Sequence, residues 1–155
     1  MKSLSRPEQK QELLSRIQRV QPASERLWGK MSSHQMICHL ADGYRLYMGE
    51  ISGEPVAASA LIKGIMRTAA LYMPMPWPRG VIPTLPSIDQ AAGYGTSPAE
   101  FANDVRVLCK LLERFTQLPS NYVWKQHPGL GTLSYSQWMR LGYLHADHHL
   151  RQFGA

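Results

Sequence analysis

Four stretches of this 155-residue sequence each begin with a helix-start signal and continue with apolar residues three and four positions apart. Because an α-helix has about 3.6 residues per turn, this spacing gathers the apolar side chains on one helix face. The predicted helices span residues 6–21, 33–49, 98–117 and 134–152. No stretch alternates apolar and polar residues as a half-buried strand does. The sequence therefore predicts an all-α domain, an up-and-down bundle of four antiparallel helices.

The start signals are of two kinds. In a capping box, a serine side chain and a Glu or Gln three residues later exchange hydrogen bonds with backbone N–H groups. Three such boxes are predicted, at Ser5–Glu8, Ser32–Gln35 and Ser134–Gln137. The fourth signal places Pro98 at the first position of a helix and Glu100 at the third. A weaker helical pattern over residues 57–72 indicates a short fifth helix.

The stretch from Pro74 to Pro98 has a different composition. It holds six of the 11 prolines, together with Gly80, Gly93 and Gly95. Proline lacks a backbone N–H and disrupts a helix interior, so this stretch is not helical throughout. It is also too long for an ordinary connection between helices. We therefore expect a long proline-rich connection between helices 2 and 3 of the bundle, acting as a binding loop or a lid.

Length and composition bound the class of protein. With 44% hydrophobic and 18% charged residues, the chain has the make-up of one globular domain spanning residues 1–155. It starts without the apolar core of a signal peptide, and no stretch approaches the roughly 18 apolar residues of a membrane span. Two cysteines, Cys38 and Cys109, are too few for a disulfide framework and fit a reducing compartment. We expect a cytoplasmic protein with no membrane partner.

The formal net charge of +6 raises the question of nucleic-acid binding. Seven of the 17 Lys and Arg residues lie in the first 30 positions, but Glu8, Glu12 and Glu25 lie among them. The other cations are scattered and lack the interleaved aromatic residues of proteins that bind single-stranded nucleic acid. A solvated basic surface explains this pattern better than a nucleic-acid partner.

Histidine placement is the most informative chemical feature. His145 and His149 are four residues apart, so their side chains lie about 40° apart on one helix face. This spacing lets two imidazoles bind one ion, as in the His-x-x-x-His helices of zinc enzymes. His39 lies on the apolar face of another predicted helix and could supply a third nitrogen. Three imidazoles with an open position are typical of a catalytic metal. Spacing alone leaves a second interpretation open, in which His39 is an ordinary core histidine and His145 and His149 are a solvated pair without a metal.

Other polar residues are weaker candidates. Asp42, three residues after His39, could orient an imidazole, act as a base towards bound water or bind the metal. It could equally be a carboxylate at the edge of the bundle. We expect His148 to flank the histidine pair and His127 to form a hydrogen bond within a turn. For His34, in the first turn of its helix, we expect a helix-end role or plain exposure.

At these positions the sequence resembles a branch of the DinB/YfiT-like superfamily. The matching motifs are Trp28-Gly29-Lys30-Met31-Ser32, Met36-x-x-His39-Leu40-Ala41-Asp42, His127-Pro-x-x-Gly131-x-Leu133, Trp138, and Tyr143-Leu144-His145-x-x-His148-His149-Leu150-Arg151-Gln152-Phe153. The terminal His-x-x-His-His-Leu-x-Gln is the most specific of them. The resemblance covers the chain from about Trp28 to its C-terminus.

Members of this superfamily are four-helix bundles that bind a divalent metal, typically zinc or nickel, through one His of the second helix and two of the fourth. The resemblance therefore implies His39, His145 and His149 as metal ligands. Relatives include transferases that use low-molecular-weight thiols. This implies a metal-dependent enzyme, a thiol-dependent transferase or a hydrolase, that acts on a small-molecule substrate. Asp42 is the candidate catalytic residue.

Two other functions remain as alternatives. One is a stress-associated bundle that binds a metal or a small ligand without turnover. The other is a dimerising interaction module, because Tyr143 and Leu150 lie on the side of the last helix opposite the histidines. A homodimer would follow from the second alternative.

Overall fold

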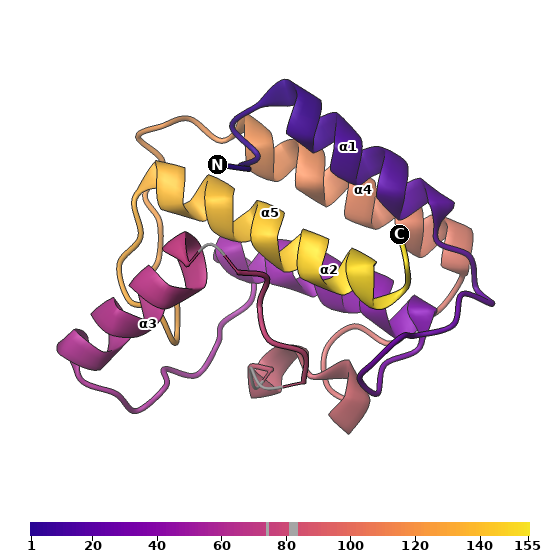
Figure 1. Ribbon diagram of the computed structural model, residues 1–155, viewed down its shortest axis with the longest axis horizontal. Coiled ribbons are helices and arrows are strands. Elements are labelled where there is room, and N and C mark those ends of the chain that lie inside the picture. Colours follow the sequence, from indigo (N-terminus) through magenta and orange to yellow (C-terminus); the bar gives the residue numbers. More distant parts are fainter. Residues whose placement is uncertain (74, 81–83) are drawn as a thin grey trace.

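The computed structural model describes residues 1–73, 75–80 and 84–155, and within these ranges the chain is helical (Figure 1). The α-helices are α1 (Pro7–Arg19), α2 (Ser33–Tyr47), α3 (Ala60–Tyr72), α4 (Phe101–Gln117) and α5 (Tyr135–Gln152). Two short 3₁₀-helices, η1 (Pro86–Ile88) and η2 (Gln90–Ala92), precede α4. The described ranges contain no strand. The predicted all-α bundle and its short fifth helix are confirmed.

Two of the four predicted helix starts are confirmed in detail. Ser32 and Ser134 each accept a hydrogen bond from the backbone N–H three residues later, and the glutamine at that position bonds back to the serine N–H. These capping boxes satisfy N–H groups that have no partner inside the helix. The starts of α2 and α5 therefore follow from local sequence.

The other two helices use start signals that differ from the predicted ones. In α1, the N-cap is Arg6 without a side-chain cap, and Pro7 at the first helical position is the effective start signal. The predicted Ser5–Glu8 capping box is therefore absent. α4 begins three residues later than expected, because the Glu100 side chain accepts hydrogen bonds from the next free N–H groups and acts as the cap. Pro98 consequently lies outside the helix.

The helices do not simply alternate in direction; the chain runs through the bundle in an up-down-down-up order (Figure 1). α2 and α4 are parallel, because His34 contacts Asp104 at the start of both helices and Tyr47 lies near Phe115 at their ends. α1 and α5 form the other parallel pair (Figure 1). The physical reason is the long connection from residue 48 to residue 100, which returns the chain to the end of the bundle where α2 began.

The hydrophobic core lies between α1, α2, α4 and α5. Its largest fully buried side chains include Trp138, Tyr44 and Phe115. Tyr143 and Leu150 also belong to it, with 1% and 0% of their surfaces exposed. The sequence-based docking face on the last helix is therefore wrong, since α1 packs against that side of α5 and buries both residues.

The connection between α2 and α4 contains α3 and the two 3₁₀-helices. α3 stands at the edge of the bundle beside α5, anchored by Leu71, the one residue of this helix that is fully buried (Figure 1). η1 and η2 lie against α2. Parts of the predicted proline-rich connection, at residue 74 and residues 81–83, lie outside the described residues. None of the described helices is long and apolar enough to cross a membrane.

Candidate metal centre

Three histidines converge between α2 and α5. His39 comes from α2, and His145 and His149 come from successive turns of α5. The Nε2 atoms of His39 and His145 are 3.0 Å apart, and one ring nitrogen of each histidine lies within 4.8 Å of those of the other two. The ring centroids are 4.6 to 5.0 Å apart. The structure thus brings together the three histidines that the sequence singled out.

A glycine lets the two helices approach at this point. Gly43, one turn after His39 in α2, faces the His145 ring, and a Cβ atom at position 43 would lie 3.0 Å from Cε1 of that ring. This is closer than nearly all real Cβ contacts. Gly43 therefore leaves the space that His145 needs to reach His39.

The orientation of the His39 ring is fixed from outside the cluster. Its Nδ1 is 2.9 Å from the backbone carbonyl oxygen of Ile88, in η1. A carbonyl only accepts hydrogen bonds, so Nδ1 carries the proton of the neutral ring and donates it. The lone pair then lies on Nε2, the nitrogen that faces His145. One residue of the connection therefore sets the tautomer of His39.

Gln152 does the same for His149. The Gln152 Nε2 atom donates to the carbonyl oxygen of Trp28 at 2.6 Å, which fixes the orientation of the side-chain amide. Its Oε1 atom is then the acceptor for Nδ1 of His149, at 3.0 Å. Nδ1 of His149 therefore carries the proton, and Nε2 keeps a free lone pair.

Tyr47 supplies the outer hydrogen bond of His145, with its hydroxyl oxygen 2.9 Å from Nδ1. Burial raises the pKa of Tyr47, so its hydroxyl stays protonated at neutral pH. A hydroxyl can donate to Nδ1 when His145 carries its proton on Nε2, or accept from Nδ1 when Nε2 acts as a ligand. Tyr47 therefore supports both tautomers of His145.

The surroundings keep these rings neutral. Burial lowers the pKa of His39, although the Ile88 carbonyl opposes this effect. Burial lowers the pKa values of His145 and His149 well below the ordinary value, and the neighbouring imidazoles lower them further. Neutral imidazole is the form that binds metals. His39 is 2% exposed, whereas His145 and His149 are partly exposed, so the cluster is accessible from their side.

The donor set fits a divalent ion that prefers nitrogen ligands. Zinc binds histidine nitrogen at roughly 2.0 to 2.1 Å, so two ligands of a tetrahedral ion lie roughly 3.3 Å apart. The 3.0 Å separation of the His39 and His145 nitrogens is close to this value. Outer hydrogen bonds to Nδ1 orient histidine ligands in metal sites, and all three rings have one. The three histidines could therefore bind one metal ion.

Comparison with known proteins places the whole chain in one family. A family model described as "Protein of unknown function (DUF1569)" matches residues 2–155. The chain belongs to the DUF1569 family. Neither the curated proteins nor the solved structures contain a match to it. The family description assigns no reaction, so the chemistry has to be argued from the site.

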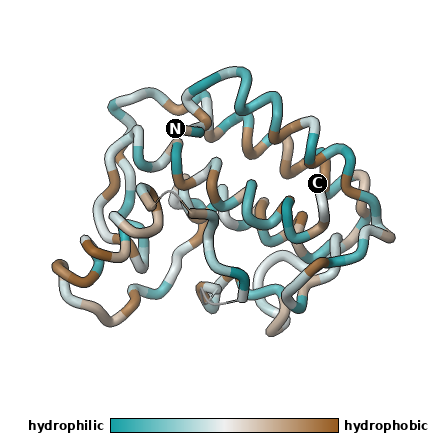
Figure 2. The backbone as a smooth tube through the Cα atoms, in the orientation of Figure 1, coloured by the Kyte–Doolittle hydropathy of each residue, from teal (hydrophilic) through white to brown (hydrophobic). Residues whose placement is uncertain are grey.

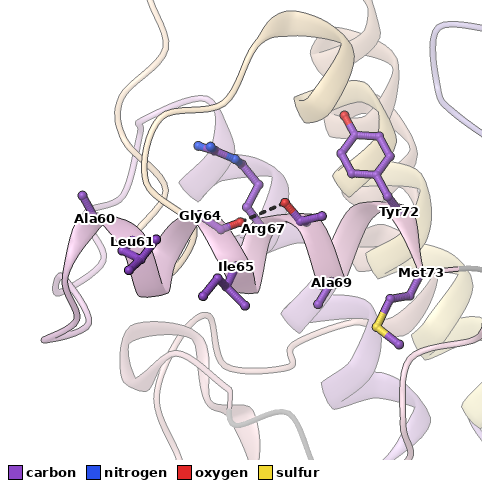
Figure 3. A pocket seen from close by; sticks show the side chains of 9 residues that line it. Ala60, Leu61, Gly64, Ile65, Arg67, Ala69, Tyr72 and Met73 are labelled. Atoms are coloured by element: carbon purple, nitrogen blue, oxygen red, sulfur yellow. Dashed lines mark hydrogen bonds between the residues drawn. The ribbon is translucent and has the colours of Figure 1, made fainter.

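The proline-rich connection of this DUF1569 protein borders the histidine cluster. The ring centroid of Trp77 lies 6.3 Å from that of His145, and Ile88 holds His39. Two pockets of the described structure lie away from the histidines. One follows α3 (Figure 3), and the other lies between Trp77 and the outer side of α5. Neither is lined by any of the three histidines.

The carboxylate of Asp42, the candidate catalytic residue, is hydrogen-bonded to groups outside the histidine cluster. It is 2% exposed, and its carboxylate accepts hydrogen bonds from the backbone N–H and the hydroxyl of Thr96, both at 2.7 Å, and from Arg45 at 2.9 Å. Within the described part of the chain it forms no hydrogen bond to the three imidazoles. In the DUF1569 protein, Asp42 therefore ties the connection before α4 to α2.

His148 flanks the cluster, as the sequence indicated. Its ring lies between Trp28 and Trp77, with centroid distances of 5.9 and 5.8 Å. Its Nδ1 is buried and has no hydrogen-bond partner among the residues that the structure describes. His127 also matches expectation, because its Nδ1 accepts hydrogen bonds from the N–H groups of the turn that follows it.

Of the two expectations for His34, the structure shows the helix-end role, with the residue partly buried. Its Nε2 is 2.7 Å from a carboxylate oxygen of Asp104, which also accepts the N–H of Ala99. Cys38 lies nearby, and burial and the Asp104 carboxylate raise its pKa to about 12. These residues could form a second metal-ligand group. However, Asp104 and His34 lie at the starts of α4 and α2, where the helix dipoles favour a carboxylate over a cation.

Sequence reasoning gave no role to the three groups that orient the histidines. Tyr47 stood on the same predicted helix face as His39, and Gln152 stood within the terminal motif, but spacing does not show which ring nitrogen a side chain contacts. The Ile88 contact uses a backbone carbonyl, for which the sequence carries no signal. Only the fold of the connection places that carbonyl against His39.

Proposed function

We propose that this DUF1569 protein holds a divalent metal ion at His39, His145 and His149 and acts as a metal-dependent enzyme of the transferase or hydrolase type. One observation carries the proposal: every ring of the cluster has an outer hydrogen-bond partner at Nδ1. When Tyr47 accepts a hydrogen bond from Nδ1 of His145, each of the three rings has its Nε2 lone pair available to an ion. Such an arrangement orients histidine ligands towards one ion.

The resemblance to the DinB/YfiT-like superfamily supports the same ligand set. The family match covers the chain from residue 2 to residue 155, and we assign the DUF1569 protein to this superfamily. Zinc or nickel is then the expected ion, and a low-molecular-weight thiol is the expected co-substrate beside a small-molecule substrate. The two cysteines are free and suit a reducing cytoplasm.

When bound, a divalent ion supplies Lewis acidity, which favours proton loss from an oxygen or sulfur ligand near neutral pH. The residues of the chain determine where this chemistry takes place. Ile88 and Gln152 hold the protons of His39 and His149 on Nδ1, away from the ion. The Tyr47 hydroxyl would accept a hydrogen bond from Nδ1 of His145 when Nε2 of that ring binds the ion. The partly exposed sides of His145 and His149 admit a small substrate, and Trp77 borders this approach.

The second candidate function is a metal-binding bundle without turnover. The bonding of Asp42 favours it, because that carboxylate is occupied by Thr96 and Arg45 and is not available to take a proton from a substrate. An enzyme would then depend on the ion to activate its substrate.

Activity assays on protein of known metal content separate the two candidates. Zinc-loaded wild type is tested against ester and amide substrates and against electrophiles with a low-molecular-weight thiol. The enzyme proposal predicts turnover that scales with bound metal and disappears in His145→Ala, while the exposed substitution Gln18→Leu in α1 leaves it unchanged. Fully loaded wild type without turnover across the panel would support the binding bundle instead.

A further inference from the structure

α3 presents a wide apolar face to solvent. Its large exposed side chains and those just after it are Leu61 (74%), Ile62 (51%), Ile65 (62%), Met66 (42%), Tyr72 (44%), Met73 (51%) and Met75 (65%). In Figure 3, Leu61, Ile65 and Met73 project from one side of the helix, and Figure 2 shows its hydrophobic character at the edge of the molecule. A continuous apolar patch of this kind marks an interaction surface.

The polar residues of α3 lie on the opposite side from this apolar face. Arg67 donates a hydrogen bond to the carbonyl oxygen of Thr132 at 2.7 Å, and the stem of Lys63 lies beside Gly131. Both cations therefore face the connection between α4 and α5. A helix that covers a protein core shows the reverse pattern, with apolar residues inward and charges outward. α3 therefore turns its apolar side outward, as expected for a helix whose outer face contacts an apolar environment.

The size of this face argues against a second copy of the chain as the occupant. Thirteen residues make α3 about 20 Å long, and one side of a cylinder about 10 Å wide offers roughly 300 Å². A stable dimer buries roughly 800 Å² on each partner. A single helix face is too small for that, whereas it is sufficient for shallow and reversible insertion into a lipid surface.

Charge indicates what kind of lipid surface would fit. From Pro55 to Ile88 the sequence contains no Asp or Glu that would repel an anionic surface, and the whole chain carries a formal charge of +6. Tyr72 projects on the other side of α3 (Figure 3), where its hydroxyl accepts a hydrogen bond from Gln137 at 3.3 Å and the Arg140 guanidinium lies 5.9 Å from its ring. We propose that α3 binds an anionic lipid bilayer with its apolar face inserted between the headgroups. This replaces our expectation of no membrane partner.

Vesicle co-sedimentation tests the proposal on the full-length protein. Wild type is mixed with vesicles of phosphatidylcholine alone or of phosphatidylcholine with phosphatidylglycerol. We expect binding to the anionic vesicles that weakens with salt, and much less binding to the neutral ones. Ile65→Asp should reduce the partition coefficient roughly tenfold or more, because it removes buried apolar area and adds a negative charge. Val123→Asp is the matched control, since Val123 is 89% exposed and lies outside α3.

Two outcomes overturn the proposal. The first is no binding of wild type to anionic vesicles, or equal loss of binding in Ile65→Asp and Val123→Asp. The second is self-association by sedimentation equilibrium that Ile65→Asp abolishes while vesicles bind nothing, which would assign the face to a second copy. The metal content of each variant is measured in parallel. Because α3 contributes no ligand to the histidine cluster, the outcome is independent of the proposed metal site.

Discussion

Substitution of Gln152 tests whether the hydrogen bonds around the histidines serve metal binding. The side chain is 3% exposed and joins Nδ1 of His149 to the carbonyl oxygen of Trp28. Gln152→Leu is similar in size but removes both bonds. Loss of an outer hydrogen bond typically weakens a metal site by roughly 10- to 100-fold, which corresponds to about 1.4 to 2.7 kcal/mol. We expect a loss of zinc affinity in that range.

The same substitution should also reduce folding stability. The Trp28 carbonyl loses its donor, and an unpaired buried polar group costs about 1 to 3 kcal/mol. Denaturant unfolding must be followed on metal-free protein, because a bound ion stabilises the folded state by mass action. Zinc affinity is measured separately by competition with a chromophoric chelator. Gln18→Leu, on the exposed side of α1, is the control for both measurements.

Gln152→Glu separates the two effects. The carboxyl group keeps an acceptor for Nδ1 of His149 in either protonation state, so zinc affinity should stay within a few-fold of wild type. The ionised form lacks the donor to Trp28, so stability should fall. If Gln152→Leu and Gln152→Glu lose zinc affinity equally, or if Gln152→Leu binds zinc like wild type, the orienting role of Gln152 is refuted.

Three further predictions follow from the geometry. Tyr47→Phe should lower zinc affinity roughly tenfold in chelator competition, because Nδ1 of His145 loses its partner; unchanged affinity would contradict the role of the hydroxyl. Asp42→Asn should reduce the unfolding free energy by about 1 to 3 kcal/mol in urea melts and leave zinc content and any turnover unchanged, since this carboxylate holds Thr96 and not an imidazole. Burial lowers the pKa of His127 from 6.5 to about 4, so only the unfolded chain takes up this proton between those values. His127 should therefore account for up to about 3 kcal/mol of the stability that metal-free protein loses as pH falls from 6.5 to 4, beside the contributions of the cluster histidines. His127→Gln should reduce that loss, and an equal loss in both proteins would count against it.

The sequence predicted the helices well because their signals are local. The serine caps of α2 and α5 and the apolar spacing within each helix depend on residues a few positions apart. The start of α4 was misplaced because Pro98 and Glu100 both act as start signals, and sequence alone does not show which prevails. The parallel pairing of α2 and α4 depends on the path of a long connection, which no local pattern encodes.

The histidine cluster was predictable for a related reason. His145 and His149 are one turn apart on α5, and His39 lies on the face of α2 that packs against α5. The helical spacing within each of these two helices is therefore enough to predict that the three side chains meet. Asp42 shows the limit of this reasoning. It lies three residues after His39, but its carboxylate bonds to Thr96, a residue more than fifty positions away in the chain. Helical spacing places a side chain on a face without identifying its partner.

Metal analysis of untagged protein, purified without a metal-affinity column, tests the central claim most directly. Wild type and His39→Ala are each incubated with excess zinc, desalted and measured by elemental analysis. We expect about one ion per chain in wild type and almost none in His39→Ala, since two remaining imidazoles hold zinc weakly. Circular dichroism should show that the variant keeps its helices, because the hydrophobic core does not depend on the ion. Wild type that retains no zinc, or a folded His39→Ala protein that retains as much zinc as wild type, would contradict the three-histidine site.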